Sequence, residues 1–299
     1  MKLHLLPPML VMALVAPGVL PMAAQSPGPT SSQDAPPPPD PGPPQSDWSI
    51  AAGVFGQHGP RYLGSEESQS KAAPFLKLDY KDIVGFQPSQ NLDRTMGLYV
   101  RPFQTGPWSV SLLAMGEILG REEKTAKALK GMGDRKRGLF YGLELALRTE
   151  PVTASLEILK GSSSTGLVAG LNLSHELHFG ERWGLELGLG TTWGDKDYHA
   201  WDFGITPSQA ARRASLIQAG NLDLRPADAR PFTPKAGLRE VRAQATLQWR
   251  VTDRFMPLGM LQHGRLLNDA AASPLTRARN QTSFVLGFAY QFSGGGPRP

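Results

Sequence analysis

Histidine, glutamate and serine are the residue types in this sequence that could do chemistry, and the segment HELH at His175–His178 is the first candidate. Two histidines beside a glutamate are ligand types of a zinc site. In metalloproteases the two histidines are four residues apart on a helix and therefore share a face. Here they are three apart in a predicted strand, so they point to opposite faces. We predict no metal site at this segment.

A hydrolase site is not supported by a local motif either. The sequence has no G-x-S-x-G segment, which presents the nucleophilic serine in many hydrolases. The residues His58, His175, His199 and His263 have no evident serine or acid partner, although a site built from separate strands stays an alternative. We therefore predict a non-enzymatic protein without catalytic residues, metal or cofactor.

The N-terminal region predicts export. Met1-Lys2 precedes an apolar run at 9–20, and Ala23-Ala24 offer small residues for cleavage, so we expect residues 1–24 to be a secretory signal peptide. Residues 25–47 contain DAPPPPDPGPPQ, which predicts a disordered periplasmic arm. The chain has no cysteine and a net charge of +5. An exported chain of this kind must hold its fold without disulfides, and we expect no nucleic-acid partner.

Short alternating runs replace the proline-rich composition from Trp48 onward and predict β-strands. Their number is even, about twelve, as in bacterial single-chain outer-membrane barrels. The predicted strands are Trp48–Gln57, Ala73–Tyr80, Ile83–Pro88, Arg94–Pro102, Trp108–Leu119, Gly138–Thr149, Val152–Lys160, Gly166–Phe179, Arg182–Trp193, Gly237–Arg250, Val251–Gly264 and Gln281–Phe292.

The connections between these strands alternate in length. Short turns are expected near 80–82, 103–107, 149–151, 180–181 and 251–253, and longer loops at 59–72, 89–93, 120–137, 161–165, 194–236 and 265–280. Such asymmetry is typical of membrane barrels with periplasmic turns and extracellular loops. The sequence thus predicts a transmembrane antiparallel up-and-down β-barrel over residues 48–292, with a long structured outer loop at 194–236 and a flexible tail at 293–299.

The two faces of the strands differ in polarity. In Trp183–Trp193, tryptophan, leucine and threonine alternate with glycine and Glu186. Alternation alone leaves open a soluble barrel with the apolar face inside, but export, strand number and loop asymmetry favour an apolar face in contact with lipid. Lumen-facing charges are then expected at Glu144, Arg148, Glu157, Glu176, Glu186, Arg242 and Arg250.

Two loops carry further predictions. The basic loop 121–137 could contain a short helix ended by Gly131, and its charges Lys127, Lys130, Arg135, Lys136 and Arg137 could contact lipopolysaccharide phosphates. In the long loop, Thr206-Pro207 predicts a cap and a helix start. The segment 198–216 could plug the lumen or cover the outer mouth.

Several segments resemble the MipA/OmpV family, also described as MltA-interacting proteins. WDFGITPSQAARRASL at 201–216 is similar to the family's Y-F-G-V-T-x-x-x-A signature, RLLNDAAASPL at 265–275 to R-L-x-G-D-A-A-x-S-P-L, and GQHGPRYLGSEE at 56–67 to P-x-Y-x-G-S. Trp201-Asp202, Arg212-Arg213 and Asn268 depart from the family pattern. The resemblance implies loop-structuring roles for Tyr62, Gly64, Phe203, Gly204, Thr206, Asp269, Ser273 and Pro274.

The resemblance also implies a location and partners. It implies a barrel in the outer membrane of a Gram-negative cell, in contact with lipid and lipopolysaccharide. The terminal aromatic Phe292 resembles the assembly signal that barrel-assembly machinery recognises. The implied role is a scaffold between a lytic transglycosylase and a murein synthase in peptidoglycan biosynthesis; a porin-like small-solute channel gated by 198–216 is the alternative.

Overall fold

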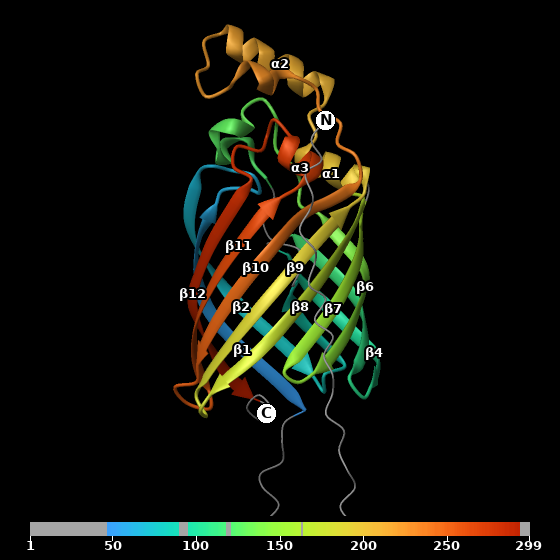
Figure 1. The fold of residues 1–299 in the computed structure, drawn as a ribbon, viewed down its shortest axis with the longest axis vertical. Helices are drawn as coiled ribbons and strands as arrows, with labels where there is room; N and C mark the ends of the chain where they lie inside the picture. Colours follow the sequence, from blue (N-terminus) through green and yellow to red (C-terminus); the bar gives the residue numbers. More distant parts are fainter. Residues whose placement is uncertain (1–46, 90–94, 118–120, 163, 294–299) are drawn as a thin grey trace, which may run out of the picture. The chain divides into compact units, whose positions relative to one another are not determined.

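The computed structural model describes residues 47–89, 95–117, 121–162 and 164–293, and these form a closed twelve-stranded antiparallel barrel (Figure 1). The strands are β1 (Trp48–Pro60), β2 (Ser68–Tyr80), β3 (Val84–Pro88), β4 (Thr95–Thr105), β5 (Trp108–Glu117), β6 (Leu139–Thr149), β7 (Val152–Gly161), β8 (Leu167–Phe179), β9 (Trp183–Gly194), β10 (Gly237–Trp249), β11 (Phe255–Leu266) and β12 (Asn280–Ser293). The predicted signal peptide, the arm and most of the C-terminal tail lie outside the described residues.

Closure comes from the pairing of the first strand with the last. β1 pairs with β12 from Ile50↔Ser293 to His58↔Phe284, and every other strand pairs with its neighbours in sequence. A strand edge in hydrocarbon would leave backbone N–H and C=O groups without partners, so closure is what a lipid-exposed sheet requires. The predicted fold class is confirmed.

The outer surface of the barrel is apolar. On β12, Phe284, Leu286, Phe288, Tyr290 and Phe292 are all exposed, Leu286 at 69%. Where short turns join the strands, Trp183 stacks on Trp249 with ring centroids 5.3 Å apart, and Trp48 lies 4.9 Å from Tyr80. Such an apolar band with aromatic residues at its border is the surface that barrels present to lipid.

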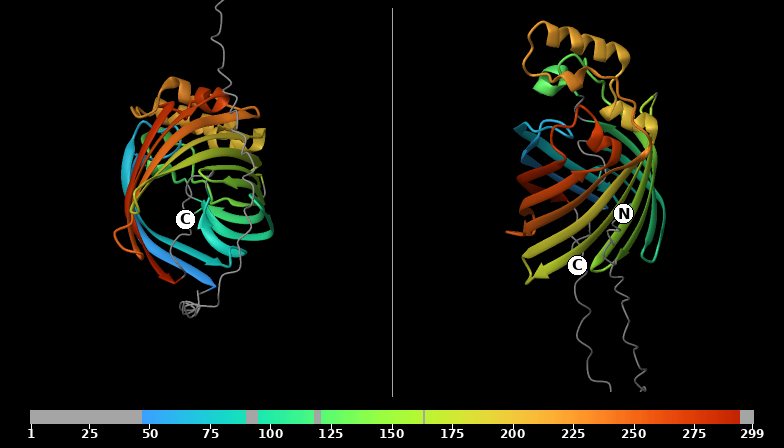
Figure 2. Two further views of the ribbon diagram at one scale, coloured as in Figure 1. Left: turned by 60° about the horizontal axis from the view of Figure 1, so that its bottom comes forward. Right: turned by 45° about the horizontal axis from the view of Figure 1, so that its top comes forward.

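The two ends of the barrel differ, as the loop lengths predict. One end carries short turns at 81–83, 106–107, 150–151, 180–182 and 250–254. The other carries the helices α1 (Lys196–Phe203), α2 (Pro207–Gln218) and α3 (Asn268–Ala272) and the 3₁₀ helices η1 (Glu123–Thr125), η2 (Lys127–Leu129) and η3 (Pro226–Ala229). Figures 1 and 2 show these helices gathered above one rim. No helix in the described part of the chain is long and apolar enough to cross a membrane.

Several local predictions were wrong; β1 and β4, for example, each extend three residues beyond their predicted ends, to Pro60 and Thr105. β2 begins at Ser68, not Ala73, because its polar start pairs with β1 up to Pro60. β11 begins at Phe255, not Val251, because the Thr252 hydroxyl accepts the backbone N–H of Phe255 at 3.0 Å and holds a turn. The basic loop forms two 3₁₀ helices, not one helix ended by Gly131. The predicted loop 89–93 falls mostly outside the described residues.

Phe292 carries a prediction about assembly. Its ring lies on the lipid-facing side of β12, in an edge contact with Tyr290 at 5.0 Å. We expect Phe292→Ala to lower the amount of folded barrel in the outer membrane several-fold, because it removes the aromatic end of the closing strand. Heat-modifiable migration on a gel measures the folded fraction. Phe284→Ala, on the same face of the same strand, is the control, and equal loss in both variants would contradict a special role of Phe292.

Candidate functional site

The candidate site is the outer cap, which we define as loop residues 61–67, 121–138, 195–236 and 267–279. Its helices and loops pack around a buried apolar cluster. The members of that cluster are Tyr62, Ala126, Ala128, Leu129, Met132, Ile205, Ala210 and Leu275, with Phe232 packed against them. Because these residues come from four different loops, the cap is one folded layer rather than a set of separate loops.

Hydrogen bonds across long sequence distances tie the cap loops together. The Tyr62 hydroxyl donates to the Leu275 carbonyl at 2.7 Å, and the Ser273 hydroxyl donates to the Phe203 carbonyl at 2.7 Å. Burial raises the pKa of Tyr62 further above neutral pH, so the phenol stays a donor over a wider pH range. Pro274 follows Ser273 between these two contacts.

Two glycines of the predicted loop-structuring set occupy positions that disfavour a side chain. Gly64 has φ +96°, a conformation that residues with a Cβ rarely adopt, and its carbonyl accepts the N–H groups of Arg277 and Ala278. A Cβ on Gly204 would lie 2.5 Å from the Ala200 carbonyl oxygen at the end of α1. Both glycines therefore allow backbone segments to approach closely.

The remaining family positions organise helix ends. Thr206 caps α2 in a capping box with Gln209, as predicted from Thr206-Pro207. The Asp269 carboxylate accepts the Lys235 N–H at 2.7 Å. Asn268, which stands where the family pattern has glycine, has φ +45°. Asparagine tolerates this left-handed region better than most residues, so Asn268 fits the backbone conformation found here.

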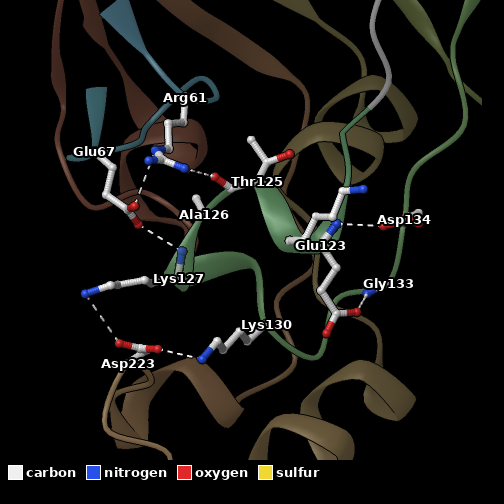
Figure 3. A pocket seen from close by; sticks show the side chains of 11 residues that line it. Arg61, Glu67, Glu123, Thr125, Ala126, Lys127, Lys130, Gly133, Asp134 and Asp223 are labelled. Atoms are coloured by element: carbon white, nitrogen blue, oxygen red, sulfur yellow. Dashed lines mark hydrogen bonds and ion pairs between the residues drawn. The ribbon is translucent and has the colours of Figure 1, made fainter. Parts of the chain in front are cut away.

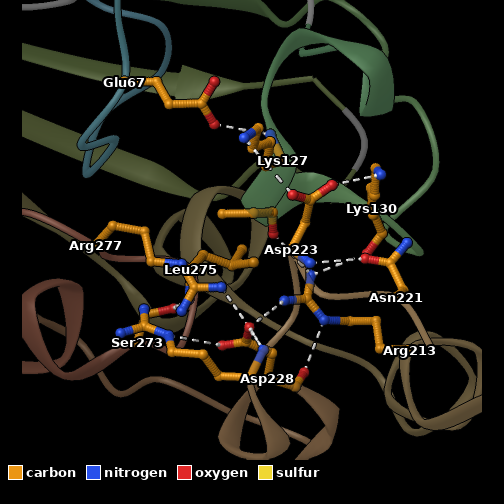
Figure 4. Close-up of polar contacts among 12 residues, drawn as sticks. Glu67, Lys127, Lys130, Arg213, Asn221, Asp223, Asp228, Ser273, Leu275 and Arg277 are labelled. Carbon is orange, nitrogen blue, oxygen red and sulfur yellow. Dashed lines mark hydrogen bonds and ion pairs between the residues drawn. The ribbon is translucent and has the colours of Figure 1, made fainter. Parts of the chain in front are cut away.

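A buried ion cluster lies at the centre of the cap (Figure 4). Asp228 contacts Arg277 and lies 3.7 Å from Arg213, and all three side chains are almost completely buried. Arg213 also donates to the carbonyls of Asp228 and Ala128, at 2.7 and 3.0 Å. Burial lowers the pKa of Arg213. It raises the pKa of Asp228, although the hydrogen bond from the Arg225 N–H and the charge of Arg213 act to lower it. The pairing therefore offsets a real desolvation cost.

The outward surface of the cap has a polar groove of about 860 Å³ (Figure 3). Two of the five proposed lipopolysaccharide ligands line it, and Asp223 pairs with both, at 2.6 Å from Lys130 and 3.7 Å from Lys127. The hydrogen bond from Lys130 lowers the pKa of Asp223. Arg135 lies inside the protein, 2.7 Å from Glu117. Only Lys136 and Arg137 of that set remain exposed without a described ion pair, so the lipopolysaccharide contact stays a prediction for these two.

Helix α1 forms part of the ceiling of the barrel lumen. Tyr198 is buried, receives a 2.6 Å hydrogen bond from Arg239, and packs edge-on against Phe140 of β6. Trp201 packs against the same Phe140 and lies under the Arg135 guanidinium at 3.4 Å. Together with Tyr62, Arg121 and Asp202, these residues line a lumen cavity of about 810 Å³. No residue of α2 lines that cavity.

The predicted lumen charges occupy different environments. Arg148, Glu186 and Arg242 line the cavity. Glu144 and Glu157 are buried directly opposite each other on β6 and β7; Ser89 donates to Glu157 at 3.2 Å, and Arg148 lies 4.0 Å from Glu144.

The other two predicted charges lie toward the end of the barrel with the short turns. Glu176 is half-exposed and pairs with His178 at 3.2 Å. Arg250 lies one residue beyond the end of β10, in the turn before β11.

His199 gives the cap a pH-dependent element. Its ring is completely buried. This burial and, to a lesser extent, the charge of Arg239 lower its pKa below the ordinary 6.5, whereas Asp202 and Asp269 act to raise it. Opening of the cap would restore the ordinary pKa and bind a proton, so opening becomes more favourable as the pH falls below about 6.5.

We expect amide exchange of α1 residues, corrected for intrinsic rates, to be faster at pH 5 than at pH 7.5 because of this proton uptake. Hydrogen-exchange mass spectrometry measures it. His199→Gln should remove most of this difference in exchange rate between pH 5 and pH 7.5. The control His263→Gln, at an exposed position of β11, should retain it. An unchanged pH dependence in His199→Gln would assign the effect to another group.

Sequence reasoning missed the buried charges of the cap. Arg213 was visible only as a departure from the family pattern, and neither Asp228 nor Arg277 stood out. Each of them stands near other polar or charged residues in the sequence, so nothing local marks it, and the cluster became recognisable only when the fold brought together residues as far apart as 213 and 277.

Comparisons with known proteins identify the family of the chain. The family model described as MltA-interacting protein MipA matches residues 52–292, whereas a search of curated proteins found no match. Similar solved structures include the COG4313 outer membrane channel from Pseudomonas putida F1, at 11% identity and TM-score 0.40 over 87% of this chain and all of that one. The NanC porin is 9% identical, with TM-score 0.38, over 81% of this chain and all of that one.

The family match spans every strand of the barrel, from within β1 to within β12. It includes the motif residues of three cap loops, whose contacts are described above. The chain therefore belongs to the MltA-interacting protein MipA family, and it is a β-barrel of the outer membrane.

Proposed function

We propose that this protein is a non-enzymatic scaffold that links a lytic transglycosylase and a murein synthase at the outer membrane. The family description names MltA as an interaction partner. The observation that carries the proposal is the cap: an apolar cluster and a buried ion cluster close the layer above the lumen. A barrel whose outer mouth is covered by a folded layer is better suited to anchoring other proteins in the membrane than to letting solutes diffuse through its lumen.

The short-turn end of the barrel is the surface available to a periplasmic partner. Exposed charged residues lie there at Glu150, Glu181, Arg182, Asp253 and Arg254. Their charges are mixed, which suits specific pairing rather than general attraction of one sign. Residue 47, at which the expected proline-rich arm 25–47 ends, lies at this end, since β1 begins beside the 81–83 turn.

Affinity capture of the full chain from solubilised outer membranes tests the proposal. We expect a lytic transglycosylase and a murein synthase to be captured together with it, and the yield to fall when residues 25–47 are replaced by a Gly/Ser segment of equal length. Capture of neither enzyme by the unaltered chain would reject the scaffold.

The alternative is a small-solute channel restricted by the 198–216 segment, and one observation favours it: the lumen cavity is lined by charged side chains such as Arg148, Glu186 and Arg242. In that function the restriction would come from α1, because Tyr198 and Trp201 line the cavity and α2 does not. Conductance measurements separate the two functions.

A further inference from the structure

The lumen cavity has two chemically different walls. On β6, β9 and β10 the wall carries Arg148, Glu186 and Arg242. On β1, β2, β11 and β12 the large apolar side chains Phe55, Phe75, Leu258, Met260 and Val285 line it, and the polar residues on these strands are Gln57, Lys71, Gln262 and Ser283. We call the five large apolar residues the apolar strip. The lumen of a water-filled barrel is normally polar, so the apolar strip needs an explanation other than solute passage.

The apolar strip is continuous across neighbouring strands. Phe55 and Phe75 are in edge contact, with ring centroids 5.1 Å apart. Met260 lies opposite Val285 in the β11–β12 pairing, and Phe55 lies opposite Gly287, two residues further along β12. A hydrocarbon body lying against this strip would remove its apolar surface from water, with a gain of roughly 25 cal/mol per Å².

The ceiling of the same cavity carries three arginines, Arg121, Arg135 and Arg239, against two carboxylates, Glu117 and Asp202. Arg121 and Arg135 are neighbours in an isolated β-bridge, and both line the cavity. Arg135 is paired with Glu117, whereas Arg121 donates to the main-chain carbonyl of Asp202 and has no carboxylate within ion-pair distance among the described residues. Burial and the charge of Arg135 lower the pKa of Arg121 to about 10. An anion beside Arg121 would offset both effects.

Beside β2 the cavity is bordered by wall residues of both faces. Five consecutive β2 residues, 71–75, line it, so residues from both faces of β2 border the cavity. Met96 lines it as well, although it shares the outward face of β4 with the exposed Leu98 and Val100. In the described part of the chain, β3 pairs with β2 only at Leu78–Tyr80. The cavity is therefore bounded by wall residues that also face the hydrocarbon layer.

From this arrangement we propose that the lumen cavity binds an anionic amphiphile with one hydrocarbon chain, its carboxylate or phosphate head at Arg121 and its chain along the apolar strip. The cavity volume, about 810 Å³, lies in the range of small-molecule sites. The molecule comes from the membrane, since the cap covers the outer mouth and Met96, on the lipid-facing side of β4, borders the cavity. This site is separate from the proposed periplasmic partner surface.

Photocrosslinking in lipid nanodiscs tests the site. The full chain is irradiated with a palmitate that carries a diazirine in mid-chain, and adducts are mapped by mass spectrometry. Alternation supplies an internal control, because Val285 faces the lumen whereas its neighbours Phe284 and Leu286 face lipid. We expect adducts on Phe75, Met260 and Val285, and unlabelled palmitate should compete with these but not with adducts on Phe284 and Leu286.

Substitutions separate head and chain recognition. Arg121→Gln should lower labelling of the lumen residues at least roughly tenfold, the effect of one lost charge-assisted hydrogen bond. Lys124→Gln removes the same charge from the same loop at a side chain that is 86% exposed and should change nothing. Because Arg121→Gln could loosen the cap, Met260→Gln provides a second variant on β11, outside the cap, and should weaken competition by palmitate.

Three outcomes would overturn the proposal. Adducts confined to lipid-facing residues would show that the lumen is not occupied. Equal lumen labelling by a diazirine alkyl-trimethylammonium would remove the role of the anionic head. Labelling of the lumen by a soluble diazirine benzoate, with none by palmitate, would assign the site to soluble aryl acids and reject an acyl ligand from the membrane.

Discussion

Replacing Asp228 by asparagine is expected to unfold the outer cap while the barrel stays folded. The substitution leaves Arg213 and Arg277 buried without the carboxylate between them. Breaking a buried pair by removing one partner costs about 3–5 kcal/mol, which exceeds what a small layer of loops can lose. Hydrogen-exchange mass spectrometry should show loss of protection in α2 and η1–η2, together with unchanged protection of β6–β10.

Asp223→Asn is the matched control. Asp223 also pairs with two cations, Lys127 and Lys130, but at a more exposed position on the same cap. Exposed pairs contribute little to stability, so exchange should stay as in the unaltered protein. Equal protection of α2 in both variants would contradict a central role of the buried cluster.

Removing the aromatic part of the ceiling should open the barrel to ions. In planar bilayers we expect no conductance steps from the unaltered protein, because Tyr198 and Trp201 of α1 pack against Phe140 above the lumen. The double substitution Tyr198→Ala/Trp201→Ala removes both rings and should give resolvable steps.

Arg212→Ala is the control for that measurement, since its side chain is exposed on α2 and does not line the cavity. It should remain silent. Regular steps from the unaltered protein would favour the channel over the scaffold, and silence of the double variant would mean that the lumen is restricted below α1.

The barrel could be predicted from the sequence because its signal is local. Alternation with a period of two marks each strand, and the aromatic and leucine residues of Trp183–Trp193 and Ser283–Phe292 fall on one face without knowledge of any partner strand. Errors occurred where the chain pairs without an apolar pattern, as at Ser68–Ala72, or where Thr252 holds a turn inside an apolar run.

The cap could be predicted only in part because its contacts are not local. The hydrogen bond from Tyr62 to Leu275 spans 213 residues, and the family resemblance pointed to that region without showing what it touches. The sequence suggested that the charges of loop 121–137 face solvent and bind lipopolysaccharide. In the structure Arg135 is buried against Trp201, and Lys130 pairs with Asp223 of another loop. A positive charge in a sequence does not reveal whether its counter-charge lies elsewhere in the chain.

The scaffold is tested most directly by the affinity of the full chain, in nanodiscs, for a purified lytic transglycosylase of the MltA type. We predict saturable binding that weakens at least roughly tenfold in Arg182→Glu/Arg254→Glu, which reverses two charges at the periplasmic end, as loss of specific charge pairs would do. Lys124→Glu/Arg212→Glu reverses two charges on the outer cap and should bind as the unaltered protein does. Absence of binding, or loss of binding only in the cap variant, would contradict the account.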